Sequence, residues 1–517
     1  MDIIEIVPPS APFTEAQRMW LNGFLSGWLG NEAGAAPAAD GATAPETEDE
    51  QDYPWHDDTM PLEERMALAE EKPFKLKLMA AMGQQDCGQC GYLCKSYAEA
   101  LADGQEKDPT LCVPGGRETR QVVKELLADH EDEIGTGSAG AATSAAAPGT
   151  RAHPLPARIK SLSRLTLDGS VKDIRHVELD LTGLELEYRV GDSLGIYPTN
   201  EPALVDALLA CLGLSGREMI VAGGDMTTTG EALFRLKDIT KPSDEAVALL
   251  AEAATDTTEA KALAALASEG VEEGVDLLDL LESYPSASPD PIALVAALGD
   301  LQPRLYSISS SPAAHAGEVH ATVAVVRYDR GDRSRHGVAS TFLSERTAPG
   351  ATVPVYIQPT ADFRLPEDPA TDIIMVGPGT GIAPFRSFLY ERAAQNADGR
   401  AWLFFGNPNE ATDYMYREEF EAFLAGGTLS RIDLAFSRDQ AEKIYVQHRL
   451  LEHGADVWDW LSNGAYFYVC GDATRMAVDV QNALLEIFAS HGGMDEEAAK
   501  AHLKQLTSEG RYLKDVY

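Results

Sequence analysis

The chain has 517 residues, more than a single domain usually contains, and its 44% hydrophobic content can form a sizeable core. A formal net charge of -40 argues against a nucleic-acid-binding protein, whose binding surface would be basic. Such acidity either serves solubility or favours partners with basic docking faces. Without a secretory signal or an apolar run approaching the ~20 residues that span a bilayer, we expect a cytoplasmic protein.

Residues 1–30 hold a predicted aromatic helix at 13–29, in which Trp20, Phe24 and Trp28 recur at helical spacing. Residues 31–60 are predicted to be a flexible linker, since Ala, Pro, Gly and acidic residues dominate there. A tethered aromatic helix could dock on a partner or on another subunit, which leaves a homo-oligomer open. It could equally pack on its own chain.

Residues 61–130 are predicted to form a small, mainly helical domain, with helices at 61–83, interrupted at Pro73, and at 95–103. Clustered cysteines in a large chain indicate a metal centre rather than a disulfide scaffold. Four thiolates can hold a cubane iron–sulfur cluster or a tetrahedral zinc ion, and free thiols are the third alternative. The candidate ligands are Cys87, Cys90, Cys94 and Cys112.

The sequence motifs around these cysteines are informative. A Cys-Gly-x-Cys-Gly-Tyr run is followed by a third cysteine, an Ala-Glu-Ala-Leu helix and Asp-Pro-x-x-Cys-x-Pro-Gly-Gly. These motifs, which cover about 30 residues, resemble the small four-cysteine iron–sulfur domain of corrinoid iron–sulfur proteins and electron-transport complex subunits. The resemblance favours an iron–sulfur cluster over zinc, although the middle spacing is one residue shorter than usual.

Residues 131–152 are predicted to be a second linker. Its glycine-rich run 135–140 is not interpreted as a phosphate loop, because no strand precedes it. From residue 153 short alternating strands predict an antiparallel β-barrel over 153–365, with an Ala/Leu-rich helical insert at about 201–300.

Within this region the strand Arg304-Leu305-Tyr306-Ser307 offers a cation for phosphate oxygens, an aromatic face for a flat ring and a hydroxyl. The small-residue turn 337–340, Gly-Val-Ala-Ser, opens a helix whose free N–H groups could receive a pyrophosphate, although most such turns bind nothing.

Residues 366–517 alternate strand and helix, which predicts an α/β doubly wound domain. The apolar strand 372–376 runs into Gly377-Pro378-Gly379-Thr380-Gly381 and a helix, the geometry that binds dinucleotide phosphates. Ser437 and Arg438 end a later strand, and Lys443, Tyr445 and Gln447 follow. This set suits a 2′-phosphate, so NADPH is favoured over NADH.

The motifs over residues 153–517 resemble, in order, the ferredoxin-NADP reductase-like half of the diflavin reductases, and most closely the flavoprotein (alpha) component of assimilatory NADPH-sulfite reductase. They are Arg-Leu-Tyr-Ser, Gly-Val-Ala-Ser, Gly-Pro-Gly-Thr-Gly-Ile-Ala-Pro-Phe-Arg, Phe-Phe-Gly-Asn-Pro, Ser-Arg-Asp-Gln-x-x-Lys-Ile-Tyr-Val-Gln, Cys-Gly-Asp-Ala and the terminal Asp-Val-Tyr. The aromatic N-terminal helix resembles the segment of that component implicated in assembly and haemoprotein docking.

The resemblance implies roles for individual residues. FAD would be held by Thr240, Arg304, Leu305, Tyr306, Ser307, Thr322, Val323, Ala324, Tyr328, Gly337, Val338, Ala339 and Ser340. NADPH would be held by Thr380, Ser437, Arg438, Lys443, Ile444, Tyr445, Val446, Gln447 and Asp479. Ser307, Cys470 and Asp515 match the trio around the hydride-transfer centre, and Tyr517 matches the terminal aromatic over the flavin ring.

One departure from the family is informative. The family places a flavodoxin-like FMN domain before the FAD domain, and here the four-cysteine domain stands in its place. We therefore hypothesise that a [4Fe-4S] cluster replaces FMN as the exit relay towards a separate sirohaem iron–sulfur sulfite reductase (beta) subunit, which reduces sulfite to sulfide. Two alternatives stay open: another acceptor, such as a nitrite reductase, a cytochrome or a ferredoxin, or a zinc adaptor that only tethers a partner.

Overall fold

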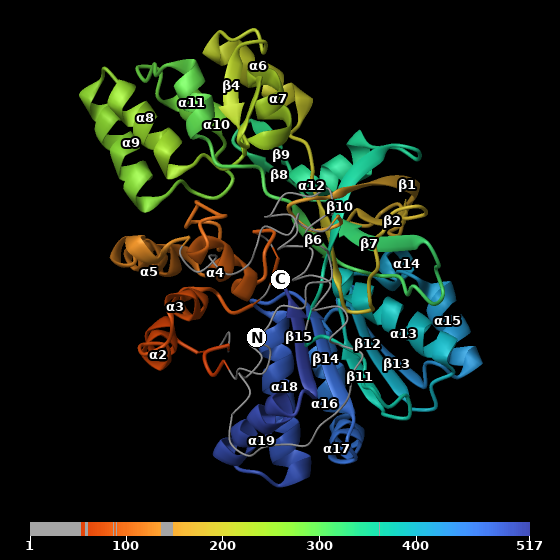
Figure 1. Cartoon of the computed structure of the whole chain (residues 1–517). Helices are drawn as coiled ribbons and strands as arrows, with labels where there is room; N and C mark the ends of the chain where they lie inside the picture. Colours follow the sequence, from red (N-terminus) through yellow and green to blue (C-terminus); the bar gives the residue numbers. More distant parts are fainter. Residues whose placement is uncertain (1–52, 57–59, 86, 89, 136–147, 361) are drawn as a thin grey trace, which may run out of the picture. The chain divides into compact units, whose positions relative to one another are not determined.

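A computed structural model describes residues 53–56, 60–85, 87–88, 90–135, 148–360 and 362–517 (Figure 1). The chain divides into two units, Met1–Tyr53 and Pro54–Tyr517, and the description below concerns the second. The aromatic helix predicted at 13–29, most of the linker predicted at 31–60 and the centre of the linker at 131–152 lie outside the described residues.

The four-cysteine region is mainly helical, as predicted. The break expected at Pro73 is confirmed, because Pro73 is the residue that precedes the second helix. A buried core that includes Leu78, Met79, Tyr97 and Leu101 holds the helices together. They are α2 (Leu62–Leu68), α3 (Phe74–Ala81), α4 (Cys94–Ala102) and α5 (Gly116–Asp129), followed by a 3-10 turn at Glu131–Glu133.

The next region is a six-stranded antiparallel sheet in the order β6-β3-β10-β1-β2-β7. The predicted antiparallel strands are therefore confirmed, and an isolated bridge between Ile308 and Ala321 links the end of β6 to β7. Closure into a barrel stays a prediction. The strands are β1 (Leu155–Arg164), β2 (Ile174–Asp180), β3 (Ser193–Ile196), β6 (Arg304–Ser307), β7 (Glu318–Ala324) and β10 (Thr352–Gln358).

Between β7 and β10 lie a hairpin and a short helical turn that the sequence did not predict in full. They are β8 (Arg327–Arg330), β9 (Arg333–His336), α12 (Val338–Thr341) and a π-helical turn at Phe342–Arg346. The helix start predicted at Gly337 is confirmed, since Gly337 is the N-cap of α12.

The insert between β3 and β6 is helical, as predicted, and has its own apolar core. Ser243, Asp256, Asp276 and Asp290 cap four of its helices by accepting N–H bonds, which explains where these helices begin. Its elements are α6 (Pro202–Leu212), β4 (Met219–Ala222), β5 (Asp225–Thr228), α7 (Thr229–Glu231), a π-helical turn at Ala232–Leu236, α8 (Asp244–Ala253), α9 (Thr257–Glu269), α10 (Leu277–Ser283) and α11 (Pro291–Ala297).

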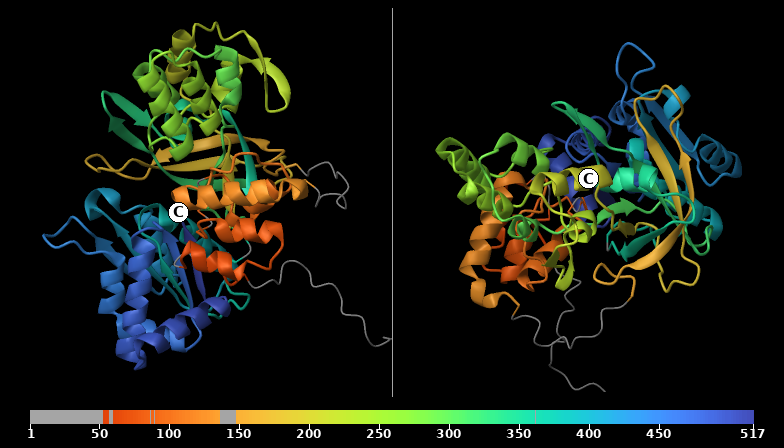
Figure 2. Two further views of the ribbon diagram at one scale, coloured as in Figure 1. Left: turned by 90° about the vertical axis from the view of Figure 1, so that its left-hand side faces the viewer. Right: turned by 90° about the horizontal axis from the view of Figure 1, so that it is seen from above.

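The C-terminal region is a five-stranded parallel sheet in the order β13-β12-β11-β14-β15, with helices on both faces (Figures 1 and 2). Ile374 and Val376 of β11 face one core, whereas Ile373 and Met375 face the other, because successive side chains of a strand point to opposite sides. The apolar runs in these strands therefore indicate a sheet buried on both faces.

The strand order reverses between β11 and β14, and in doubly wound sheets ligands bind beside the carboxyl ends of strands at such a point. The elements are β11 (Ile373–Val376), a 3-10 turn at Gly379–Ile382, α13 (Ala383–Gln395), β12 (Ala401–Asn407), α14 (Glu410–Asp413), α15 (Arg417–Gly426), β13 (Arg431–Phe436), α16 (Val446–Glu452), α17 (Gly454–Ser462), β14 (Tyr466–Gly471), α18 (Met476–Gly492), α19 (Glu496–Ser508) and β15 (Tyr512–Val516).

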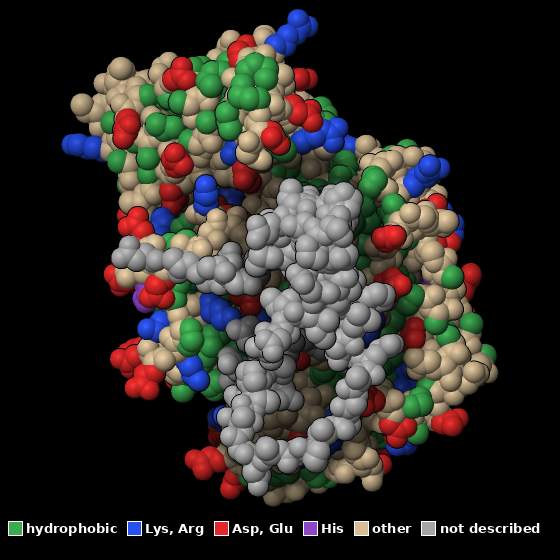
Figure 3. Space-filling model, viewed as in Figure 1, with side chains coloured by type: hydrophobic (Ala, Val, Ile, Leu, Met, Phe, Trp, Pro, Cys, Tyr) green, Lys and Arg blue, Asp and Glu red, His purple; other side chains and the backbone are tan. Residues whose placement is uncertain are grey.

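On the face shown in Figure 3, Asp and Glu outside the grey atoms are spread over the molecule rather than gathered in one patch. Among the helices of the described residues, none combines the length and apolarity needed to cross a membrane.

Candidate active site

A large cleft of about 1030 Å³ is the main candidate site. Its wall combines β6 with the glycine-rich turn after β11 and with the end of the chain, through Tyr306, Ser307, Thr380, Asp515 and Tyr517. Cys87 and Cys112 belong to the same wall. Segments more than 400 residues apart in the sequence therefore meet at one cleft.

Most residues that the resemblance assigns to FAD line this cleft. They are Thr240, Arg304, Leu305, Tyr306, Ser307, Thr322, Ala324, Tyr328 and the turn Gly337, Val338, Ala339 and Ser340. Val323 does not line it, because alternate residues of β7 face opposite sides and the Val323 side chain is fully buried in the core of the sheet.

The residues assigned to NADPH, apart from Thr380, do not line this cleft. Ser437 and Arg438 follow β13, and Tyr445 is the N-cap of α16. The Gln447 amide donates to Asp479 of α18 over 3.0 Å. Ile444 and Val446 pack into the sheet's core, so their side chains cannot face a ligand that Lys443, Tyr445 and Gln447 would contact from the surface.

Ser307, Cys470 and Asp515 form one hydrogen-bonded group. The Ser307 hydroxyl donates to Asp515 Oδ2 over 2.6 Å, and Cys470 Sγ lies 3.5 Å from the same oxygen. Cys470 and Asp515 are partners in the parallel pairing of β14 with β15. Burial, together with the Asp515 carboxylate, raises the pKa of Cys470 well above its usual value, so the thiol is neutral and can act as a donor.

Tyr517 is tied into the same cleft by both its backbone and its side chain. Its hydroxyl donates to Thr380 Oγ1 over 2.8 Å, and its N–H donates to the Gly471 carbonyl over 3.0 Å. The last strand, β15, and the residue directly after it therefore place Asp515 and Tyr517 beside the turn that follows β11.

The glycine-rich turn after β11 requires its glycines for space. A Cβ on Gly381 would lie 2.0 Å from the Cys470 carbonyl oxygen, and one on Gly377 would lie 2.4 Å from the Gly381 carbonyl oxygen. Gly379 has a positive φ of 60°, which favours glycine. The glycines therefore leave backbone atoms of the turn uncovered just before α13. A phosphate can approach such a turn closely.

Lys172, in the connection between β1 and β2, is a functional candidate that the sequence reasoning missed. Its Nζ donates to Asn407 Oδ1 over 3.0 Å and lies 3.6 Å from the Cβ position of Gly379. Burial of the ammonium group and, to a smaller extent, the Arg438 cation lower the pKa of Lys172. No local pattern signals this residue, because the fold brings it to the turn from another sheet.

The four cysteines line one small cavity, together with Met82, Tyr92, Tyr97 and Pro114 among others. The Gly83 N–H donates to Cys112 Sγ over 3.4 Å. All six cysteines lie in the described residues, and none is in a disulfide. Burial raises the pKa of Cys90 to about 11 and also raises that of Cys112.

This donor set fits a thiolate-bound metal centre. Four sulfur ligands converge on one cavity, and a backbone N–H group points at one sulfur, as in iron–sulfur sites. Gly88 and Gly91 have positive φ values of 65° and 75°, so they allow the ligand loop to turn tightly.

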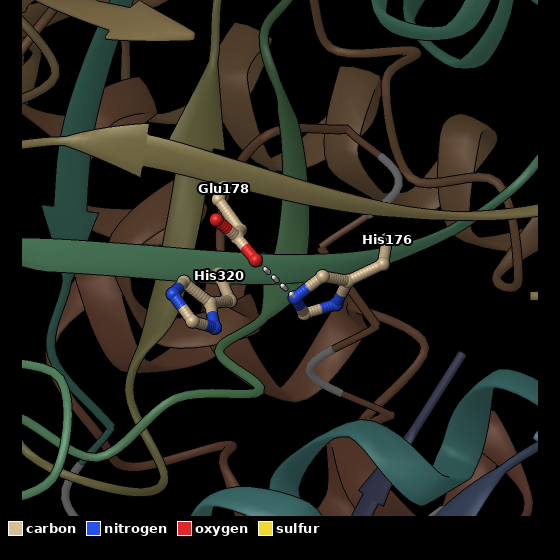
Figure 4. Close-up of side chains that lie close together, drawn as sticks. All are labelled: His176, Glu178 and His320. Carbon is tan, nitrogen blue, oxygen red and sulfur yellow. Dashed lines mark ion pairs between the residues drawn. The ribbon is translucent and has the colours of Figure 1, made fainter. Parts of the chain in front are cut away.

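A second cluster, His176, Glu178 and His320 on β2 and β7, has three potential ligand atoms within 4.8 Å of one another (Figure 4). Its nitrogens already have partners: His176 Nδ1 lies 2.9 Å from the Tyr416 hydroxyl, and His320 Nδ1 lies 3.3 Å from a nitrogen of the buried Arg386. A fixed cation there opposes a second one. We assign this cluster to the packing of α13 and α15 against the sheet.

These histidines predict an acid-sensitive fold. Burial, with Arg386 as a smaller cause, lowers the pKa of His176 to about 2, and burial lowers that of His320 to about 4. Both rings are neutral in the folded state, so below the unfolded pKa of about 6.5 the unfolded chain binds more protons and stability is lost as pH falls. At pH 5 we expect a loss of roughly 2 kcal/mol for each ring.

Thermal melts from pH 8 to pH 5 measure this loss. His176→Gln should flatten the decline, because one protonation site is removed while those of His320 and His315, whose pKa values burial also lowers, remain. His491→Gln, which changes an exposed ring in α18, is the matched control. An unchanged slope for His176→Gln would contradict the assignment.

Comparison with known proteins identifies the parts of the chain. Residues 147–342 match the family "FAD binding domain", residues 375–482 match "Oxidoreductase NAD-binding domain", and residues 84–114 match "Putative Fe-S cluster". The last match contains all four clustered cysteines.

Similarity to curated relatives covers most of the chain. The sulfite reductase [NADPH] flavoprotein alpha-component of Bacillus subtilis is 44% identical over 400 residues, or 75% of this chain and 66% of the relative. Those of Serratia proteamaculans and a Shewanella species are 44% and 45% identical over 377 and 378 residues, which are 72% and 71% of this chain and 62% and 61% of the relatives.

The chain thus spans slightly less than two thirds of the length of the curated relatives it matches. Its FAD-binding and NAD-binding domains and the geometry of its cleft agree with the similarity. The chain is therefore a homologue of the sulfite reductase [NADPH] flavoprotein alpha-components.

Proposed function

We propose that the chain is an NADPH-dependent electron-transfer flavoprotein that delivers electrons from NADPH, by way of FAD and a [4Fe-4S] cluster, to a sirohaem sulfite reductase subunit. The observation that carries the proposal is the single cleft lined both by Tyr306 and Ser307 of β6 and by Cys87 and Cys112. The names of the relatives support NADPH as donor and sulfite reduction as the outcome.

The cleft residues fit FAD. Arg304 supplies a cation for phosphate oxygens, and Tyr306 supplies an aromatic face. The cleft has a volume of about 1030 Å³, at the upper end of the range for small-molecule sites, which suits a dinucleotide. When bound, FAD can accept a hydride and release electrons singly, and an iron–sulfur cluster carries one electron at a time.

The Ser307–Asp515–Cys470 group would hold a proton beside the reacting centre. Ser307 and the neutral Cys470 thiol both converge on Asp515 Oδ2, so a proton can be held or moved at that oxygen. Tyr517, fixed by Thr380 and Gly471, would exclude water until the nicotinamide enters.

The 2′-phosphate of NADPH would lie beside Ser437, Arg438, Lys443 and Tyr445, which follow β13. The pyrophosphate would lie over the turn that contains Gly379 and Thr380. Lys172, next to Gly379, would add a cation there.

Lys172→Ala is expected to raise the KM for NADPH about tenfold while leaving kcat within about twofold, since a charge-assisted contact to a non-reacting phosphate is lost equally from ground and transition states. Steady-state ferricyanide reduction measures both constants. Lys500→Ala, on the exposed face of α19, is the control. A fall in kcat with an unchanged KM would contradict this role.

An anaerobic NADPH titration with optical and EPR spectra tests the proposed function. We expect FAD to bleach first and a reduced-cluster signal to follow, after which added sulfite reductase haemoprotein should produce sulfide. Bleaching without iron in the protein would favour the zinc adaptor. A cluster that reduces but delivers no electrons to the haemoprotein would favour a different acceptor.

We also propose, from resemblance alone, that the predicted N-terminal aromatic helix docks the haemoprotein. Deletion of residues 1–30 should then weaken co-purification of the two proteins and leave the NADPH titration unchanged.

A further inference from the structure

Arg151 connects the cysteine loop to the large antiparallel sheet. It lies just before β1, and its guanidinium donates to the Gly91 carbonyl and to the Gln302 side-chain oxygen. The same guanidinium lies over the Tyr92 ring, 3.5 Å from the ring centroid. One planar cation thus holds three groups at once, which arginine allows and lysine does not.

The Gly91 carbonyl receives a second bond from the sheet. The Tyr356 hydroxyl of β10 donates to it over 3.1 Å, and the Tyr197 hydroxyl donates to the Arg151 carbonyl over 2.8 Å. Gly91 directly follows Cys90, so the bonds act on the backbone between two of the candidate ligands, Cys90 and Cys94.

The loop also packs directly on β6, the strand that carries Tyr306 and Ser307. A Cβ on Gly88 would lie 2.8 Å from Leu305 Cβ, and a Cβ on Gly91 would lie 2.8 Å from the Pro303 carbonyl oxygen. Leu305 is followed by Tyr306 and Ser307 in β6. The two glycines therefore permit close approach of the cysteine loop to the Leu305 side chain of β6 and to the Pro303 backbone before it.

We propose that Arg151 is a positioning residue that fixes the Cys87–Cys94 loop on β6, so that the cluster receives electrons in one fixed arrangement rather than after a domain movement. The proposal rests on the proposed function for the electron transfer itself. The contacts of Arg151 with Gly91, Gln302 and Tyr92 do not depend on that function.

The test uses the full chain with Arg151→Gln, which keeps hydrogen-bonding capacity but removes the charge and the fork. After anaerobic mixing with NADPH, flavin bleaching should keep the wild-type rate. Cluster reduction should then slow by at least about tenfold, since small displacements of reacting groups cost rate steeply. Arg158→Gln on the exposed side of β1 is the matched control.

Hydrogen exchange provides a readout that does not depend on turnover. Exchange at residues 90–94 should accelerate about tenfold in Arg151→Gln and stay at the wild-type rate in Arg158→Gln. Tyr356→Phe, which removes one bond to Gly91 and no charge, should give a smaller change in the same direction.

Wild-type exchange in Arg151→Gln, or wild-type cluster reduction in that variant, would overturn the proposal. Failure of the proposed function is distinct. In that case the wild-type protein itself would bleach its flavin without cluster reduction, and the exchange comparison would still decide whether Arg151 fixes the loop.

Discussion

Replacement of Cys90 by serine is expected to reduce electron delivery to the haemoprotein by at least about 10²-fold while NADPH-driven bleaching of FAD stays within about twofold of wild type. Cys90 lines the small cavity with the other three cysteines, and serine cannot replace a soft thiolate ligand. The residues proposed for hydride transfer lie on other elements, β6, β14 and β15, so the substitution leaves them in place.

Three measurements on one preparation separate the steps. Iron and acid-labile sulfide report the cluster, ferricyanide reduction reports the flavin, and sulfide production with added haemoprotein reports delivery. Cys211→Ser is the matched control, because Cys211 is exposed on α6. Sulfide production at the wild-type rate in Cys90→Ser would remove the cysteine centre from the electron path.

The sequence predicted the parts of the site that are contiguous in the chain. The glycine-rich turn after β11 is recognisable because a strand, a turn and a helix occur in order and the glycines have a local steric reason. The helix break at Pro73 and the start of α12 at Gly337 are local in the same sense.

What the sequence could not predict depends on contacts between distant segments. β15 was not predicted, because its pairing with β14 gives the C-terminal residues their strand conformation. Lys172 and Arg151 occur in connections whose composition is unremarkable, and each acquires a role only when another sheet or loop is folded against it. The side chains of Val323 and Val446 lie in the core, which the motifs alone do not reveal.

Asp515→Asn is expected to slow hydride transfer from NADPH to the flavin by about 10²-fold with little change in the KM for NADPH, because the carboxylate is the shared acceptor of the Ser307 hydroxyl and the neighbour of the Cys470 thiol. Stopped-flow bleaching with NADPH and with NADPH deuterated at the transferred position measures the step directly. Asp456→Asn, an exposed carboxylate of α17, is the matched control.

The double variant Ser307→Ala with Asp515→Asn tests whether Ser307 and Asp515 act as one unit. Ser307 donates to Asp515 Oδ2 over 2.6 Å, and Cys470 Sγ lies 3.5 Å from that oxygen, so Ser307→Ala already removes part of the arrangement that Asp515→Asn disrupts. Residues that act as a unit give losses that do not multiply. The double variant should therefore be only slightly slower than Asp515→Asn, whereas losses that multiply would mean that Ser307 contacts the flavin independently of Asp515.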